Sequence, residues 1–376
     1  MPAPRRRRVT ISTVARRAGR SVSTVSAALN NAPGVASSTR QEIRDIAHQL
    51  GYEADPKARL LRRASTGLIG VSFVAGQAFQ VELVDALYAA CERRGRDIAL
   101  SAVTGSRDET EGVRGLLRER CESLVLVDSA VEDALLREAA AVMPVVLLCH
   151  DTGVPGVDVV RSQDDVGVRA LVEHLLSTGR RRLVHIDGGG ASAAPVRRRV
   201  FTEVLAERGL PASVVAGGDD EESGTRAVSA LAARGVLPQA LVCFNDRCAL
   251  GAVLELRRRG LRVPEDVAVT GYDGIPFSGL SALDLTTVRQ DAPVIADVAV
   301  RRAVAGMESM AGSAGSAGSA GTVSRPSGGG GPEADSDQGL PGGLPAGVVV
   351  DRLPGGGAVY SVRPHLLVRG SSAPSS

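Results

Sequence analysis

The sequence predicts a chain of two parts, an N-terminal all-α helix-turn-helix domain and an α/β core built on doubly wound parallel sheets. Residues 9–63 hold short apolar helical faces, whereas residues 67–310 alternate apolar runs with helical segments. Charge divides the chain at the same place, because residues 1–63 hold 13 Lys and Arg against 4 Asp and Glu. That is +9 in a chain of +2, so the remaining 313 residues sum to −7. A basic head on an acidic body is typical of a phosphate-neutralising module attached to a domain that does not bind nucleic acid.

The first two helices are predicted from apolar residues that recur at helical spacing on either side of a turn. These residues are Val14, Ala15 and Ala18 in the first helix, and Val22, Val25, Ala28 and Leu29 in the second. In the turn between them, Gly19 is suited to the positive φ that ends a helix, and Ser21 is suited to capping the next one. Two short helices joined in this way form a helix-turn-helix.

A third helix is predicted where Ser38 and Gln41 have the spacing of a capping box. Its apolar face consists of Ile43, Ile46, Ala47 and Leu50. Gly51 ends this helix, which closes a small domain at residues 9–54. Residues 1–8 are predicted to be a basic disordered arm, and a solvated tail without a role of its own fits the arginine run equally well. Residues 55–63 are helix-capable and basic, and taken alone they also fit an ordinary linker.

The order VTI, VARRAG, VSTVSAALN, VASSTR, LGY, DPKARLLRR resembles, without a gap, the N-terminal domain of the LacI/GalR family of bacterial transcription regulators. The resemblance implies that the second helix enters the major groove of DNA. It also implies that residues 55–66 form a hinge helix and linker. In that hinge Leu61 would wedge into the minor groove while Ala58 packs against the partner's hinge.

Roles on DNA follow from position, because the first residues of a recognition helix face base edges and flanking hydroxyls face phosphates. Val22 and Ser23 are predicted to contact bases. Phosphate contacts are predicted for Thr10, Ser12, Thr24, Ser26 and Asn30. Ala27 stands where the family often has arginine, the residue type best suited to a bidentate guanine contact. We therefore expect an operator that deviates from the family's usual half-site.

Six apolar runs in the body predict strands of a parallel sheet, at 68–71, 124–127, 145–148, 183–186, 240–243 and 267–269. Helices are predicted between them, for example at 81–94 and 167–177. Five cysteines stand singly and predict buried free thiols rather than disulfides or a zinc site. No run of 18 apolar residues occurs, and no apolar stretch follows the arginine run as an export signal requires. We therefore expect a cytoplasmic protein without a membrane span.

Three long strings in the body again resemble the family: DDVGVRALVEHLLSTGRRRLVHIDGG, CFNDRCALGAVLELRRRGLRVPEDVAVTGYDG and LTTVRQ. They imply a periplasmic-binding-protein-like effector-binding core at 67–310, with two doubly wound parallel-sheet subdomains, three crossovers and an effector in the cleft between them. The first subdomain would hold residues 67–160 and 289–310. The second would hold residues 161–288 and 347–370.

Polar residues that follow predicted strands are the candidates for the cleft, since ligands of such sheets bind at the carboxyl ends of strands. Asp273 and Asn245 follow strands directly, and Arg197 is expected in a loop after the strand ending at residue 186. The resemblance matches all three to ligand-contacting positions, and Phe79 to an aromatic at the cleft mouth. Each fits a structural role as well, and Asn245 in particular could cap the next helix.

Two departures from the family concern the nature of the ligand. Cys149 stands where the family often has an acidic residue, and residues 219–221 stand where it often has an aromatic platform. Aromatic residues make up only 2% of the chain, and it contains no tryptophan, so few side chains are available to stack on a sugar ring. A sugar or related metabolite remains the expected effector.

The C-terminal region begins with the repeat AGSAGSAGSAG, which opens a low-complexity insertion at 311–346 that cannot bury a core. Order is expected to return at 348–350 and 359–368, and a disordered tail is expected at 371–376.

These observations predict a repressor that binds a palindromic operator as a homodimer, with an effector in the cleft altering DNA affinity. The chain is not expected to be an enzyme, because it has no phosphate loop, nucleophile elbow or metal-ligand spacing. For the same reason no cofactor and no metal are expected. The alternative is a solute-binding protein with the same body fold, which the basic head and the missing export signal disfavour.

Overall fold

The computed structural model describes residues 9–29, 31, 33–52, 66–235, 237–316 and 343–373. The chain divides into two compact units, residues 1–66 and residues 67–376. Several predictions lie outside the described residues, namely the basic arm at 1–8, nearly all of the hinge at 55–66, and most of the low-complexity insertion. The same holds for three residues predicted to contact DNA, Asn30, Ala58 and Leu61.

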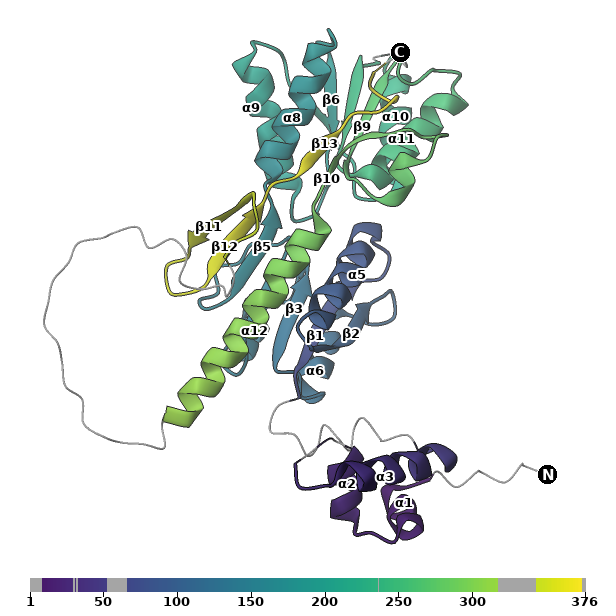
Figure 1. Ribbon diagram of the computed structural model, residues 1–376. Helices are drawn as coiled ribbons and strands as arrows, with labels where there is room; N and C mark the ends of the chain where they lie inside the picture. The colour runs from purple at the N-terminus through teal and green to yellow at the C-terminus, as the bar shows by residue number, and fades with distance from the viewer. Residues whose placement is uncertain are drawn as a thin grey trace, which may run out of the picture. The chain divides into compact units, whose positions relative to one another are not determined.

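The described part of the first unit contains three helices, α1 (Ile11–Ala18), α2 (Val22–Leu29) and α3 (Ser37–Gln49) (Figure 1). Their buried apolar residues meet in one small core, formed by Val14, Ala15, Val25, Ala28, Ile43 and Ala47. The predicted turn is confirmed: Gly19 has φ 59° and ends α1. The Ser21 hydroxyl accepts a hydrogen bond from the backbone N–H of Thr24 at 3.1 Å and so caps α2.

The predicted capping box is wrong. The N-cap of the third helix is Ala36, two residues before Ser38, so the helix begins at Ser37 and no side chain caps it. Ser38 and Gln41 are therefore both inside the helix, where Gln41 is too far along to reach back to a cap. Instead the Gln41 amide donates to the Asp45 carboxylate at 2.9 Å, a contact along the helix surface.

The second unit has two lobes, each built on one sheet. The sheet of the first lobe has the strand order β11-β12-β5-β4-β3-β1-β2. These strands are β11 (Val348–Arg352), β12 (Ala358–Val362), β5 (Asp158–Ser162), β4 (Val145–Leu148), β3 (Ser123–Val127), β1 (Leu68–Val74) and β2 (Asp97–Val103). All neighbours are parallel except β11 and β12. In register, Val71 lies between Leu100 and Val125.

Helices cover both faces of this first sheet, as doubly wound topology requires. On one face α5 (Ala78–Glu92) and α12 (Ala292–Ser316) pack side by side, and Leu83, Leu87 and Ile295 join one apolar core (Figure 1). On the other face α6 (Glu109–Arg118) and α7 (Asp133–Ala140) contribute Leu116 and Leu135 to a second core.

The sheet of the second lobe has the strand order β13-β10-β9-β8-β6-β7. Its strands are β13 (His365–Leu367), β10 (Thr286–Arg289), β9 (Ala268–Asp273), β8 (Ala240–Cys243), β6 (Leu183–Ile186) and β7 (Ser213–Val215). Only β13 is antiparallel to its neighbour among these described strands. Cores on its two faces contain α8 (Asp164–Ser177) with α9 (Ala194–Glu207), and α10 (Glu221–Ala233) with α11 (Asp246–Arg258). The six predicted strands of the body are all present.

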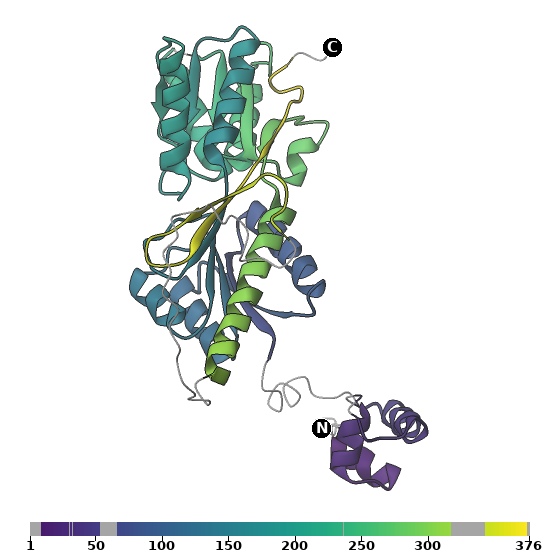
Figure 2. The ribbon, with the colours of Figure 1, turned by 60° about the vertical axis from the view of Figure 1, so that its left-hand side comes forward.

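The chain passes between the lobes after β5, after β10, and between β12 and β13, which are the three crossovers that were predicted (Figure 2). Hydrogen bonds tie two of these connections together. The backbone N–H of Gln163 donates to the Val362 carbonyl at 2.8 Å, and its side-chain amide donates to the Ser361 carbonyl at 3.0 Å. The lobes therefore meet along adjacent, hydrogen-bonded segments.

The predicted subdomain boundaries require correction in the C-terminal region. Residues 347–370 were expected in the second lobe, but β11 and β12 complete the first sheet, where Val359 pairs with Val159. Every residue of β12 is buried, so this strand covers the otherwise open edge of β5. Only β13 joins the second sheet. The other changes are small, because β5 runs to Ser162 and β10 to Arg289.

The limits of the predicted insertion and tail also differ. Helix α12 continues to Ser316, past the expected start of the insertion at residue 311, because alanine sustains a helix through the first repeat. Ser371, expected in a disordered tail, is buried: its hydroxyl donates to the Val269 carbonyl at 2.6 Å. A hydrogen bond to the second sheet thus holds Ser371 in place, although its sequence is typical of a flexible terminus. No helix in the described ranges is long and apolar enough to cross a membrane.

Candidate ligand cavity and nucleic-acid interface

A cavity of about 230 Å³ lies between the two lobes of the second unit. Both lobes line it, with Gln77, Phe79, Asp128, Cys149, His150 and Ser162 from the first, and Ser192, Arg197, Asp219, Asn245 and Asp273 from the second. Many of these residues stand at or just beyond the carboxyl ends of parallel strands, which is where sheets of this type place their ligands. The four residues predicted to bind a ligand, Phe79, Arg197, Asn245 and Asp273, all line this one cavity.

Three lining residues adopt a backbone conformation that is rare outside glycine. Asp128 after β3 has φ 48°, Cys149 after β4 has φ 61°, and Asp273 at the end of β9 has φ 106°. Such strain persists only where the surrounding structure enforces it, and it is concentrated at functional sites. Its repetition at three strand ends around one cavity identifies this edge of the two sheets as the candidate site.

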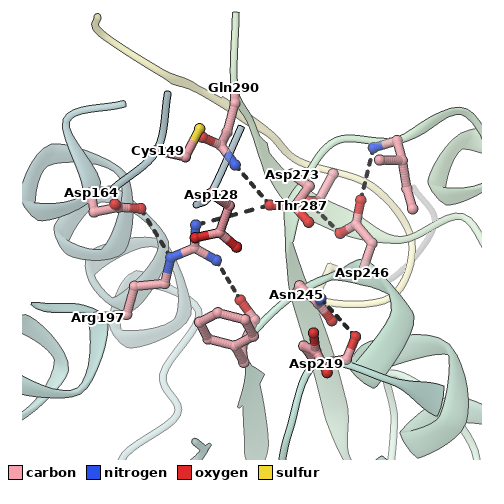
Figure 3. A network of polar contacts seen from close by, with 12 residues as sticks. Asp128, Cys149, Asp164, Arg197, Asp219, Asn245, Asp246, Asp273, Thr287 and Gln290 are labelled. Carbon is pink, nitrogen blue, oxygen red and sulfur yellow. Dashed lines mark hydrogen bonds and ion pairs between the residues drawn. The ribbon is translucent and has the colours of Figure 1, made fainter. Parts of the chain in front are cut away.

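Arg197 lies on helix α9 and not in the predicted loop. Pro195 occupies the first turn of the helix, where the missing N–H costs nothing. The Arg197 side chain is 5% exposed and points to the polar network of Figure 3. Its Nε donates to Asp164 at 2.9 Å, and Nη1 donates to the Phe244 carbonyl at 2.7 Å.

Aromatic rings and a second carboxylate complete the surroundings of Arg197. The guanidinium carbon lies 3.6 Å from the centroid of the Tyr272 ring and 4.7 Å from that of Phe244. Nη2 lies 3.9 Å from Asp273 Oδ1. Burial tends to lower the pKa of Arg197, but Asp164, Tyr272 and Asp273 outweigh it and raise the pKa, so the group stays charged.

The surroundings of Asp273 shift its pKa in opposite directions. Burial raises its pKa to about 6, although the nearby Arg197 charge and a hydrogen bond from the Gln290 amide at 2.8 Å both lower it. Asp246 is different, because it is fully buried and accepts hydrogen bonds from the Thr287 hydroxyl at 2.6 Å and the Ile275 N–H at 2.9 Å. It joins α11 to β10 and does not line the cavity (Figure 3).

Asn245 caps helix α11, the structural role left open by the sequence. Its Oδ1 accepts from the Cys248 N–H at 2.8 Å, and its Nδ2 donates to the Asp219 carbonyl at 2.9 Å. The residue is 4% exposed. Both amide atoms of Asn245 therefore already have hydrogen-bond partners, which leaves the side chain little capacity to bind a ligand. A ligand contact from this residue remains a prediction. Phe79, in the first turn of α5, is 8% exposed and lines the wall beside it.

Sequence reasoning missed several cavity residues, above all Asp128, Asp164, Ser192 and Gln290. The signal for Asp128 was available, because it directly follows a predicted strand, just as Asp273 does. Gln290 follows β10 in the same way, but that strand was not among the predicted runs. Ser192 offered no such signal, since it stands in a loop six residues beyond the end of β6.

Hydrogen bonds cross the cavity from one lobe to the other. The Gln77 amide donates to Asp219 at 2.5 Å, and Arg247 Nη1 donates to the Gly76 carbonyl at 3.1 Å. The Ser192 hydroxyl contacts the Asp128 carboxylate and lies 3.0 Å from the Cys149 carbonyl. Any change in the relative orientation of the lobes must break these contacts.

The first unit exposes the start of α2. Val22 is 39% exposed, an unusual position for an apolar side chain, and Ser23 is exposed beside it. Thr10 and Ser12 are exposed at the start of α1. The other predicted contacts within the described residues, Thr24, Ser26 and Ala27, are half-buried on α2.

The positive charge of the first unit favours binding to nucleic acid. Residues 9–52 hold five arginines against Glu42 and Asp45, and Arg16, Arg17 and Arg20 are exposed. The Ser21 hydroxyl contacts those of Ser23 and Thr24, each at 2.8 Å, which fixes the first turn of α2. An exposed, rigid helix start on a basic unit is the arrangement by which a helix-turn-helix reads a major groove.

Comparison with known proteins gives the same two-part division. Residues 10–55 match the family described as bacterial regulatory proteins, lacI family, and residues 172–324 match the periplasmic binding protein-like domain. The chain is 31% identical over 314 residues to the HTH-type transcriptional regulator GntR of Pseudomonas aeruginosa, covering 79% of this chain and 89% of that protein. It is 29% identical over 306 residues to the HTH-type transcriptional regulator GalR of Escherichia coli, covering 79% and 88%.

Solved structures share the fold. A LacI transcriptional regulator from a Rhodococcus species is 32% identical with a TM-score of 0.67, covering 82% of this chain and 98% of that one. A lac repressor dimer bound to operator and an anti-inducer is 22% identical with a TM-score of 0.75, covering 97% and 99%. The curated relatives named above are transcriptional regulators and not enzymes. The chain belongs to the lacI family of bacterial regulatory proteins.

Proposed function

We propose that the chain is a transcriptional repressor that binds a palindromic operator as a homodimer. A small-molecule effector, a sugar or related metabolite, would bind in the cavity between the lobes and change the affinity for DNA. The observation that carries the proposal is the combination of an exposed helix start on a basic three-helix unit with a strained polar cavity in a two-lobed unit. Neither the basic helix unit nor the cavity would by itself predict the presence of the other.

On DNA, Val22 and Ser23 would contact base edges, while Thr10, Ser12, Thr24 and Ser26 would contact phosphates. Ala27 has no group that could pair with guanine, so the bases opposite it would be read weakly. Asn30, Ala58 and Leu61 would complete the interface, with Leu61 wedged into the minor groove.

Support for an effector in the cavity comes from proteins of the same fold. One solved relative, 24% identical with a TM-score of 0.63, is a complex of the regulator CelR with cellobiose, and another is the lac repressor bound to ONPG. In this chain Arg197 and Asp273 would contact the effector, with Phe79 at the mouth and Asn245 beside it. The hydrogen bonds across the cavity supply the coupling, because an effector that competes for Asp219 or Asp128 shifts the balance between lobe orientations.

The homodimer is supported by the surface of α5. Val81 is 49% exposed and Tyr88 is 47% exposed, and because they lie seven residues apart they share one face of the helix. An apolar pair at this spacing suits a symmetric interface, in which one patch meets its own copy. A dimer in turn requires a DNA site with two-fold symmetry.

The test is selection of duplexes from a random DNA pool by the full-length chain at fixed salt, followed by sequencing. We expect a palindromic site. Val22→Ala should change base preference at symmetric positions only, whereas Leu61→Ala should weaken binding to every selected site. Gln49→Ala, an exposed change at the end of α3, is the control and should alter neither. Absence of any enriched sequence would refute the proposal and favour a solute-binding protein.

A further inference from the structure

The cavity between the lobes is acidic. Its lining contains five carboxylates, Asp128, Asp151, Asp164, Asp219 and Asp273, but only two guanidinium groups, Arg161 and Arg197. The lining therefore has a formal charge of −3 with His150 neutral and −2 with His150 protonated, the form that Asp128 favours by raising the pKa of the ring. This surplus was not predicted, since the sequence directed attention to one guanidinium, one amide and one carboxylate.

The cationic groups of the lining already have carboxylate partners. Arg197 donates to Asp164 at 2.9 Å, approaches Asp273 at 3.9 Å, and has aromatic rings against it. Arg161, at the rim, pairs with Asp151. The His150 ring nitrogen lies 3.9 Å from Asp128. An anionic ligand would have to take one of these cations away from its carboxylate.

Three carboxylates of the cavity, in contrast, accept hydrogen bonds from neutral donors. Asp219 accepts from the Gln77 amide, Asp273 from the Gln290 amide, and Asp128 from the Ser192 hydroxyl. Each carboxylate has lone pairs for further donors. Arg197 is shared between Asp164 and Asp273, and only a histidine lies beside Asp128, so the described cations around the cavity do not match its carboxylates one to one.

Helix dipoles do not reverse this balance. The start of α5 and the start of α9 adjoin the cavity and have no acidic residue in their first turns. Each helix N-terminus acts as roughly half a positive charge, so the two contribute about +1. The N-termini of α8 and α11 already have Asp164 and Asp246 in their first turns. The cavity remains negative.

The Ser162 hydroxyl is a further polar group of the cavity wall that the described residues do not fully satisfy. Its side chain is 4% exposed and lines the cavity, and its oxygen makes no well-formed hydrogen bond among the described residues, although the Tyr272 hydroxyl lies near enough to interact with it. Buried hydroxyls are almost always hydrogen-bonded, so one in a cavity wall without a well-formed hydrogen bond points to a polar ligand.

From these observations we propose that the effector is a polyhydroxylated amine, a small cation whose ammonium group is held by Asp128, Asp219 and Asp273 and whose hydroxyls reach Ser162. This inference rests on the proposed function, because it takes the cavity as the effector site. The same charges disfavour phosphorylated and carboxylated ligands. The amine supplies hydrogen-bond donors only, and donors are what unsatisfied carboxylates require.

Titration calorimetry on the full-length chain tests this with probes matched in shape. The probes are glucose, glucosamine, N-acetylglucosamine and glucuronate, and the corresponding galactose series, at one pH and one salt concentration. We expect the amine of at least one series to bind about tenfold or more tightly than its neutral counterparts, and the uronate of that series not to bind. Equal or tighter binding of a neutral or anionic probe overturns the inference, as does absence of binding by both amines.

Variants locate the preference. Asp219→Asn and Asp128→Asn keep the side-chain shape, and asparagine tolerates the positive φ of residue 128. Each should reduce the preference for the amine over the neutral probe about tenfold, while Asp133→Asn, exposed on α7, should leave it unchanged. An unchanged preference in both cavity variants overturns the assignment. Operator selection by the same preparations, without and with the probes, serves as the control: if the wild-type chain selects no site in either condition, the proposed function is wrong, whereas retained selection without amine binding contradicts this inference alone.

Discussion

Arg197 stabilises the cavity by compensating two carboxylates at once, Asp164 and Asp273, whose side chains are each 14% exposed. Replacing it with methionine keeps most of the apolar contact with Tyr272 but leaves Asp164 and Asp273 without a cation. Removing one partner of a buried ion pair is strongly destabilising, so we expect Arg197→Met to lower the free energy of unfolding by about 3 kcal/mol in denaturant titrations. Arg199→Met is the control, since Arg199 is 57% exposed and pairs with Glu203 on the surface. Equal effects of the two changes would contradict the role given to Arg197.

Glu82 predicts a pH dependence of stability. Burial, and then the Asp273 charge, raise its pKa to about 7, and one of its oxygens has no hydrogen-bond partner within the described ranges. An acid whose pKa is higher in the folded state than in the unfolded state holds its proton longer when folded. Its effect on the free energy of unfolding therefore becomes unfavourable as pH rises from about 4.5 to about 7.

Glu82→Gln should remove this penalty. We expect the variant to be more stable than wild type above pH 7, on the order of 1 kcal/mol after allowance for solvent screening, with a smaller difference near pH 5. The measurement is chemical denaturation at both pH values. Glu92→Gln, at the exposed end of the same helix, should show no such pH-dependent gain. A gain that is larger at low pH would contradict a raised pKa for Glu82 in the folded state.

For single residues, the sequence predicted which side chains line the cavity better than it predicted what those side chains contact. Arg197 and Asp273 do meet in one cavity, because the carboxyl ends of parallel strands converge wherever the sheet forms. The sequence could not predict that the Arg197 guanidinium already donates hydrogen bonds to Asp164 and to the Phe244 carbonyl, since those contacts join residues 33 and 47 positions apart. The acidic surplus of the cavity was missed for the same reason.

Helix α8 depends on a glycine for its packing against the second sheet. A Cβ atom at Gly167 would lie 2.4 Å from the Tyr272 hydroxyl and 2.9 Å from Val288. The glycine therefore lets the Tyr272 ring lie against the Arg197 guanidinium.

Gly167→Ala should displace Tyr272 and cost about 1 to 3 kcal/mol of stability, as overpacking of a core does. It should also weaken the binding of any cavity ligand, which calorimetry on the same preparation would show. Gly153→Ala is the matched control, since no atom lies within 4 Å of its Cβ position. A Gly167 variant as stable as that control would mean that the ring moves without cost.

Elements with continuous apolar runs were predictable, whereas partly exposed ones were not. β3 and β4 are buried along their whole length, and their sequences show it. β2 and β7 contain exposed residues and were not among the predicted strands. The start of helix α9 was expected to be a loop, but Pro195 lies in its first turn, where proline is compatible with a helix.

For the molecule as a whole, charge and periodicity were enough to predict two parts, whereas the three crossovers were implied by the resemblance to the family. They could not predict which sheet receives β12, because a buried strand fits either edge by its sequence alone. Only the pairing with β5 decides it, and that pairing joins residues about 200 positions apart.

We predict that the chain self-associates through α5. Val81→Glu together with Tyr88→Glu would place charges in the proposed interface, so we expect the dissociation constant of the dimer to rise about tenfold or more in sedimentation experiments. Affinity for the palindromic site should fall with it. Val142→Glu, which changes an apolar residue 64% exposed beyond α7, should affect neither quantity. A dimer unaffected by the double change would place the interface elsewhere.

Sequence reading by the first unit is tested by the affinity of the full-length chain for its selected palindrome, compared with a scrambled duplex of equal length and composition at the same salt concentration. We predict tighter binding to the palindrome by about a thousandfold or more, the lower range for specific DNA-binding proteins. Equal affinity for the two duplexes would mean that the basic unit binds phosphate without reading sequence, and would contradict the account.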